Sequence, residues 1–462
     1  MIGSGRKTFS GGVTLSYSYK NLTFRNQTSI GSNKSEESPY GSFSDYARQQ
    51  PYNAPWTDDG KLNRYFDGWD AWETQVQNPL YDATLGNIDK SGYVEIINNF
   101  SVEWKMTPEL TLRGKFGISH TNNTSDMYKS PESSEFKDYT GDQVLRKGRY
   151  VYTTGKANTY EGNVTLSYAK VFGEVHSLYA GLDASIAQND SYSYGFTMEG
   201  FTNDRPFLGN ALNYAENDMP SASEYTTRRL GLVGNVNYVY DNRYYVDLSL
   251  RTDGSSQFGS NKRFGTFWSA GLGWNVHNEH FWGENPYLNT LRLRLSYGET
   301  GSQKFSAYQG LPMFKYYDDD RYAYWGGAYL MGLGNEDLKW QVTAQYNLGM
   351  EFSVLNNRGK GSLDVYSKLT NNLLSAMDIP LATGFSSYME NIGKVKNTGF
   401  EMSVSGYIIR DTERKMSLMV SGKLAYNKNE ITKLSDDLKR QTEEMLMDDV
   451  DVNTLYYEGR SQ

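Results

Sequence analysis

Residues 244–276, YYVDLSLRTDGSSQFGSNKRFGTFWSAGLGWNV, contain the pattern that most of this chain repeats. In each arm, apolar residues alternate with polar residues or glycine, and a polar loop that contains glycine joins the two arms. Period-2 alternation is typical of a two-faced antiparallel hairpin. Arms of about ten residues with aromatic side chains near their ends suit an outer-membrane barrel, in which one face meets lipid and the other meets water. A soluble barrel with the faces inverted shows the same alternation.

The composition of the 462 residues favours β structure and excludes several classes of protein. The chain has 38 tyrosines, 45 glycines and no cysteine, which rules out disulfides and thiolate sites. A net charge of -8 without a lysine- or arginine-rich block argues against a nucleic-acid partner. The mean hydropathy is -0.67 and no apolar run reaches the length of a transmembrane helix. Strands that cross a membrane need only alternate apolar residues, so these values are compatible with a membrane barrel.

The alternation predicts about fourteen antiparallel strands between residues 11 and 430, with almost no helix. Connections after odd-numbered strands are mostly a few residues long, whereas those after even-numbered strands run mostly from a dozen to several dozen residues. The longest of these, 33–92, is expected to lack regular structure. Membrane barrels show this asymmetry, with short periplasmic turns and long extracellular loops. The expected strands cover residues 11–20, 22–32, 93–106, 110–124, 152–170, 175–194, 224–240, 243–254, 263–276, 290–302, 339–355, 360–375, 390–409 and 415–430.

The two faces of the expected strands differ in chemistry. Aromatic residues of the apolar face fall near strand ends, which predicts two girdles at the membrane interfaces. Trp340 and Phe352 lie on one expected strand at a spacing that rises about 28 Å across the membrane. The other face carries charges that a dry core would not tolerate, so we expect it to be wet or covered by a polar partner. Its predicted lumen-facing residues include Arg251, Arg292, Arg294 and Glu351.

The run SLRTDGSSQFGSNKRFGTFWSAGLGWNVHNEHFW at 249–282 resembles the signature hairpin of SusC/RagA-type TonB-dependent outer-membrane transporters. That signature is similar to R-x-D-G-S-S-x-F-G-x-x-x-R-x-G-x-F-P-S-x-G-x-G-W, and Trp268 stands where the family usually has proline. The resemblance covers nearly the whole chain, with further matches at 38–52, 291–303, 338–374 and 391–406.

The resemblance implies part of a barrel of about twenty-two strands. In the family, a signal sequence, a segment that contacts TonB and a globular plug precede such strands. The start MIGSGRKTFSGG has no apolar signal region, so the chain is interpreted as an internal fragment. Residues 1–431 are then a partial transmembrane barrel and 432–462 begin an extracellular loop. Both ends of the fragment are expected on the extracellular side, and in isolation it is expected to form a curved open sheet or a strained closed barrel.

The implied function is import of oligosaccharides or peptides across the outer membrane of a Gram-negative bacterium. Implied partners are a SusD-like lipoprotein on the long-loop side and the TonB complex, through the plug region. Arg292 and Arg294 are interpreted as contacts to plug or substrate, or as a solvated lumen wall. Loop aromatics are candidates for stacking on sugar rings, for packing on the lipoprotein or for packing within their own loops; they are Tyr316, Tyr317, Tyr322, Tyr324, Trp325, Trp56, Trp69 and Trp72.

The sequence offers little for catalysis. The four histidines do not form a zinc-protease motif, and no nucleophile elbow, phosphate loop or dinucleotide fingerprint is present. Asp318, Asp319 and Asp320 lack the spacing of a calcium loop and are interpreted as a solvated acidic loop. No catalytic, metal or cofactor site is therefore predicted. The rival class is a binding or adhesive protein, either an outer-membrane barrel or a soluble β protein, that displays the aromatic loops without transport.

Overall fold

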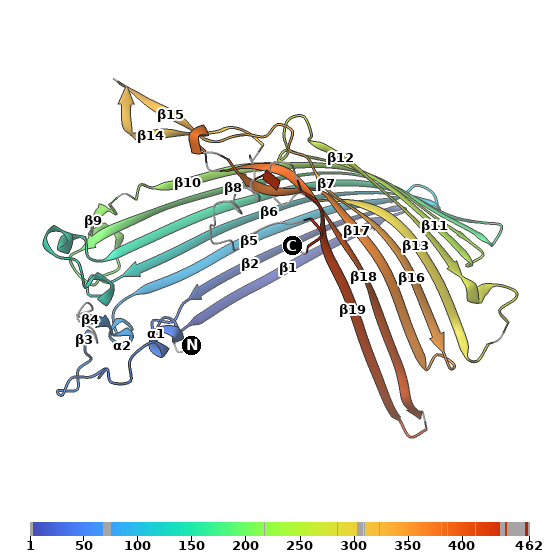
Figure 1. Ribbon diagram of the computed structural model, residues 1–462, viewed down its shortest axis with the longest axis horizontal. Coiled ribbons are helices and arrows are strands. Elements are labelled where there is room, and N and C mark those ends of the chain that lie inside the picture. The colour runs from blue at the N-terminus through green and yellow to red at the C-terminus, as the bar shows by residue number, and fades with distance from the viewer. Residues whose placement is uncertain are drawn as a thin grey trace.

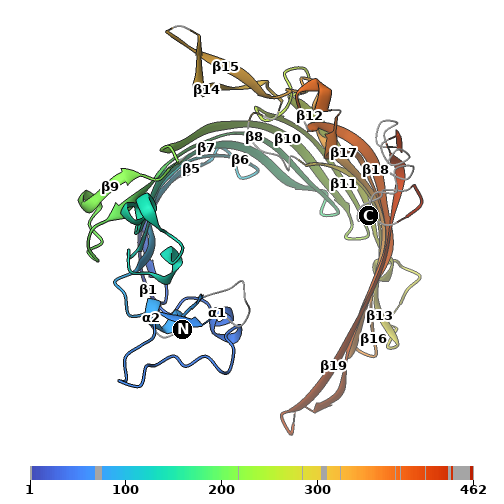
Figure 2. The ribbon, with the colours of Figure 1, turned by 60° about the vertical axis from the view of Figure 1, so that its left-hand side comes forward.

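The computed structural model describes residues 3–67, 75–216, 218–283, 285–302, 308, 310–322, 324–379, 381–385, 387–411, 413–434, 439–440 and 458–460. Its main sheet is an antiparallel path in which each strand pairs with the next one along the path. Figures 1 and 2 show that this sheet curves into an open trough. In path order the strands are β1 (Gly5–Tyr19), β2 (Leu22–Glu36), β5 (Ile88–Lys105), β6 (Leu110–Lys129), β7 (Arg149–Phe172), β8 (His176–Phe201), β10 (Ser221–Tyr240), β11 (Tyr244–Ser255), β12 (Phe264–Asn275), β13 (Leu288–Ser302), β16 (Gln341–Val354), β17 (Gly359–Asp378), β18 (Ser387–Asp411) and β19 (Met416–Leu434).

These fourteen path strands confirm the strand count and the all-β class predicted from the alternation. Strand β9 (Ala211–Tyr214) adds to β8 at the side of the path. The strands β1 and β19 lie at the two edges of the sheet and do not pair with each other, so the sheet is the curved open form of the two predicted alternatives. Among the described residues, no helix is long and apolar enough to cross a membrane.

The connections alternate in length as predicted. Tight turns join β1 to β2 and β10 to β11, and in the latter Asp241 and Asn242 adopt φ values of 47° and 52°. Asparagine and aspartate tolerate this left-handed region, which tight hairpin turns use. The registers pair Gly5 with Glu36 and Leu434 with Gly393, both beside long loops. The start of β1 and the end of β19 therefore lie on the long-loop side, as expected.

The long connections contain structure that the alternation did not predict. Helix α1 (Phe43–Ala47) begins at a capping box formed by Ser42 and Asp45, and α2 (Pro79–Asp82) begins after the N-cap Asn78. These local hydrogen bonds satisfy backbone groups that the first helical turn leaves free. The expectation that 33–92 lacks regular structure is therefore wrong. Further strands outside the main sheet are the pair β3 (Tyr65–Asp67) and β4 (Gln75–Gln77) and the pair β14 (Met313–Tyr322) and β15 (Trp325–Gly332).

The apolar face of the sheet is largely exposed, which is unusual for a protein surrounded by water. Leu248, Leu272 and Leu295 on three successive strands are 51%, 55% and 52% exposed. The buried clusters in the described part of the chain are small, such as Phe258, Phe267 and Trp340. The sheet therefore has no large interior core, and its apolar face suits contact with lipid.

Candidate functional site: the polar face of the sheet

The registers place the predicted lumen-facing residues on one face. Arg292 pairs with Asn275 on one side and with Glu351 on the other, and Arg294 pairs with Gly349. Directly paired residues of neighbouring strands point to the same face of a sheet. Arg251 pairs with Phe267, which shares its face with Asn275 because both are odd-numbered positions of β12. The structure therefore brings Arg251, Arg292, Arg294 and Glu351 to the same side of the sheet, and that this side faces a lumen stays a prediction.

Four charged side chains form an ion network on this wall. Glu351 lies 3.8 Å from Arg292 Nη1 and 3.2 Å from Arg294 Nη2, and Arg294 Nη2 also lies 3.2 Å from Asp364 Oδ1. We call Arg292, Glu351, Arg294 and Asp364 the lumen ion network. Its side chains are between 27% and 44% exposed, so the charges face a wet or polar environment. A dry interior would penalise them strongly.

Gly349 makes part of this network possible. It lies between Arg294 and Asp364 in the register, so the two side chains must cross it to meet. A Cβ atom at this position would be 2.6 Å from Asp364 Oδ1 and 3.1 Å from Arg294 Nη2. The absence of a side chain on β16 therefore permits an ion pair between strands β13 and β17.

Asn275 joins the network to the short-turn end of the sheet. Its side chain is 3% exposed and accepts a hydrogen bond from Arg292 Nε at 2.7 Å. Its amide nitrogen donates to Tyr245 Oη at 2.5 Å and to the Asn242 carbonyl at 2.7 Å. The Arg292 guanidinium also lies over the Tyr245 ring. A buried amide with these partners orients Arg292 along the wall.

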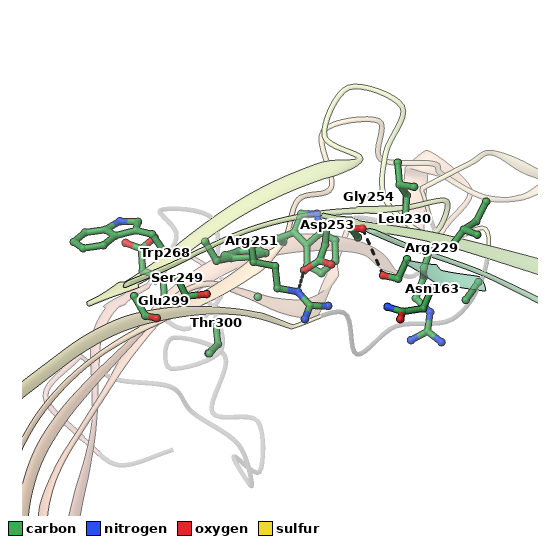
Figure 3. Close-up of a pocket in the computed structure, with 18 of the residues that line it drawn as sticks. Asn163, Arg229, Leu230, Ser249, Arg251, Asp253, Gly254, Trp268, Glu299 and Thr300 are labelled. Carbon is green, nitrogen blue, oxygen red and sulfur yellow. Dashed lines mark hydrogen bonds and ion pairs between the residues drawn. The ribbon is translucent and has the colours of Figure 1, made fainter. Parts of the chain in front are cut away.

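An open cavity of about 670 Å³ lies on the same wall near the long-loop end. Figure 3 shows Arg251 and Asp253 paired in this cavity, with Nε and Oδ2 2.5 Å apart. Arg229, Ser249 and Asn163 contribute further polar groups to the lining. The cavity is therefore lined by both signs of charge and by uncharged polar groups, an arrangement able to bind a polar chain.

The structure contradicts the prediction that Trp340 belongs to a lipid-facing girdle. Trp340 is 8% exposed, stacks on Phe258 at a centroid distance of 4.2 Å and contacts Phe267 edge to face at 5.6 Å. Phe267 belongs to the lumen face of β12, so Trp340 turns inward. On the apolar face near this position, Trp268, Tyr297 and Tyr346 form a row with neighbouring rings 4.7 Å apart. The span of about 28 Å inferred from Trp340 therefore does not apply.

The short-turn girdle agrees with the prediction. Tyr240, Tyr244 and Trp274 stack across three neighbouring strands of the apolar face, with centroid distances of 6.3 and 6.5 Å. Amphipathic rings at this level suit a membrane interface.

The structure does not gather the loop aromatics into one site. Trp56 is 54% exposed in the 37–87 connection, whereas Tyr316 (75% exposed) and Tyr324 (fully exposed) belong to the separate β14–β15 hairpin. Figures 1 and 2 place that hairpin and the 37–87 connection at different parts of the rim. Trp69 and Trp72 lie outside the described residues, and so do the side chains of Tyr317, Tyr322, Trp325 and Asp318 to Asp320.

The sequence did not single out Asn275 or Gly349. A signal for Gly349 was present in the sequence. It is a glycine on the charged face of its strand, and both neighbouring strands carry charged residues on that face. Asn275 gave no comparable signal, since its partners Asn242, Tyr245 and Arg292 are distant from it in the sequence. In the described part of the chain, no group of three or more histidine, aspartate or glutamate side chains could hold a metal ion.

A curved antiparallel sheet with one exposed apolar face, an aromatic girdle at the short-turn end of that face and a charged opposite face defines a membrane-barrel protein. Comparison with known proteins identifies the family. Residues 11–454 match the family described as TonB dependent receptor-like, beta-barrel, and the chain belongs to it. It is therefore an outer-membrane protein of a Gram-negative bacterium.

Individual relatives agree with this assignment. The chain is 30% identical over 382 residues to TonB-dependent receptor P39 of Formosa agariphila, covering 80% of this chain and 35% of that protein. It is 29% identical over 371 residues to TonB-dependent receptor SusC of Bacteroides thetaiotaomicron, covering 78% and 35%. The RagAB peptide importer in its closed-closed state superimposes with a TM-score of 0.81 and 25% identity over 94% of this chain and 47% of that chain. The chain spans about a third of the length of these curated relatives.

Proposed function

We propose that the protein carrying this chain imports oligosaccharides or peptides across the outer membrane. The observation that supports this proposal most directly is the continuous polar wall, from the lumen ion network to the cavity at Arg251 and Asp253, on the back of a sheet whose other face is apolar. A barrel that only displays loops has no need for such a wall along its length. On this proposal the chain is not an enzyme, and it binds no nucleic acid, metal or cofactor.

The same proposal assigns partners to the two ends of the barrel. A SusD-like lipoprotein covers the long-loop side, where Tyr316 and Tyr324 are exposed on the β14–β15 hairpin. The TonB complex acts from the short-turn side through a plug. The lumen ion network then meets the plug or the passing substrate, because its charges are accessible from the lumen. The names SusC and RagAB peptide importer, carried by relatives, support both substrate classes as candidates.

Uptake by living cells tests the proposal. Cells that express the full protein should accumulate a labelled oligosaccharide or peptide from the class that its neighbouring genes indicate, and accumulation should stop when the tonB gene is deleted. Binding at the surface with no TonB-dependent uptake of either class would favour the adhesive alternative.

The assignment of the hairpin aromatics has its own test. The double variant Tyr316→Ala and Tyr324→Ala should lower uptake or co-purification of the lipoprotein, because both rings are exposed and have no role in the main sheet. Tyr214→Ala is the matched control, since Tyr214 is 56% exposed on β9 at the long-loop end. Equal effects of the double variant and the control would count against these site residues.

A further inference from the structure

The connection between β12 and β13, residues 276–287, is longer than the other connections described at the short-turn end. It begins with a short 3-10 turn, Val276–Asn278, and continues through Phe281, Trp282 and Tyr287. Turns of three and four residues suffice for the neighbouring hairpins, β10–β11 and β16–β17. The additional length therefore calls for an explanation in terms of what the segment contacts.

The segment ties together the turns on both sides of it. The side chains of Asn275 and Asn278 donate to the Asn242 carbonyl in the β10–β11 turn, at 2.7 and 2.9 Å. On the other side, Leu355 N in the β16–β17 turn donates to the Tyr287 carbonyl at 3.0 Å. These hydrogen bonds fix the two ends of the segment to the neighbouring turns.

Its first half lies against the lipid-facing girdle. The Trp274 indole donates to Glu279 Oε1 at 2.9 Å, and Arg243 Nη1 lies 3.3 Å from Glu279 Oε2. The Arg243 guanidinium in turn lies over the Tyr240 ring, at 5.5 Å from its centroid. Both aromatic rings belong to the stacked row on the apolar face. Glu279 is thereby placed at the outer edge of the rim, directly beside the surface that meets lipid.

The Glu279 carboxylate of this rim is fully paired, whereas an aromatic side chain next to it is not covered. A hydrogen bond from Tyr244, with the Trp274 indole and Arg243, holds the pKa of Glu279 below its usual range. Phe281, two residues further on, is 71% exposed. A satisfied charged pair beside an exposed aromatic ring is the combination found at membrane interfaces, where one part of a side-chain cluster is wet and the other apolar.

We propose that the described residues of this connection, 276–283 and 285–287, form a membrane-interface anchor, in which Phe281 inserts into the headgroup region of the inner leaflet of the outer membrane. The occupant of this surface is phospholipid, because Glu279, two residues before Phe281, bonds to Trp274 and Arg243 at the girdle of Tyr240, Tyr244 and Trp274. The anchor adds an aromatic contact below the girdle and fixes three neighbouring hairpins at one depth.

A fluorescence-quenching experiment tests this anchor, and the absence of cysteine in the chain makes site-specific labelling straightforward. In the full-length protein, with any other cysteine removed, Phe281→Cys is labelled with an environment-sensitive fluorophore and reconstituted into phospholipid vesicles. Glu413→Cys is the matched control, because Glu413 is exposed in the tight β18–β19 turn at the same end.

The label at 281 should emit at shorter wavelength than the label at 413. A quencher attached near the lipid headgroup should reduce the emission of the label at 281 several-fold more strongly than that of the label at 413. Aqueous iodide should quench the label at 281 several-fold less than the label at 413. Equal iodide quenching at both positions would overturn the anchor, and so would shielding of position 281 from both quenchers, which would indicate a protein contact. Tyr287→Cys provides a second position in the same segment if the Phe281 variant does not fold.

Discussion

Arginine at Leu248 should destabilise the barrel because this residue lies on the lipid face. Leu248 is 51% exposed, pairs with Val236 and Ala270, and lies four residues from the girdle residue Tyr244. Four residues rise about 13 Å along the strand and, at a tilt of about 45°, about 9 Å above the girdle. In an apolar band about 25 Å tall this is near the midplane, so we expect Leu248→Arg to cost about 2–4 kcal/mol.

Ser249→Arg is the matched control, because Ser249 is the next residue of the same strand and lines the lumen cavity. It should be tolerated, with a change in unfolding free energy well under that of Leu248→Arg. The measurement is the denaturant dependence of reversible unfolding of the full-length protein in lipid vesicles. If the arginine at Ser249 cost more than the arginine at Leu248, the apolar face would be an interior core and the membrane assignment of the faces would be refuted.

Three further perturbations address the lumen wall and the rim. Gly349→Val should break the Arg294–Asp364 ion pair that crosses β16 and lower the unfolding free energy by about 1–3 kcal/mol. Gly114→Val is the control, because no atom lies within 4 Å of a Cβ built at Gly114, and it should cost less in the same denaturant assay. Trp340→Ala should lower the unfolding free energy by about 3 kcal/mol and increase proteolysis of the loop at 256–263. If Trp56→Ala, at a half-exposed tryptophan, lowered the unfolding free energy equally, the buried placement of Trp340 would be contradicted. The folded-state pKa of Glu279 is lowered from its ordinary 4.5, so its stabilising effect is present above that pH and is lost as pH falls through the lowered value. The wild type should therefore have a higher Tm than Glu279→Gln at neutral pH, and this difference in Tm should shrink in acid. A difference in Tm that does not depend on pH would rule out this role of the carboxylate.

The alternation of residues determined the faces of the sheet, the number of strands and the side on which the long loops lie. Period-2 alternation is a local property, because successive side chains of a strand point to opposite faces whatever the strand pairs with. For this reason Arg251, Arg292, Arg294 and Glu351 could be assigned to one wall from sequence. The resemblance of 249–282 to a known signature then supplied the family.

Only the tertiary structure decided which side chains meet. Trp340 has the parity of the lipid face, yet it lies just before β16, where it is free of the strand alternation and packs inward on Phe258. Gly349 matters only because Arg294 and Asp364, far apart in the chain, lie on its two sides. Strand parity fixes the direction of a side chain within a strand, whereas contacts between strands and at their ends depend on register and on loop packing. These involve residues distant in sequence, and no local pattern encodes them.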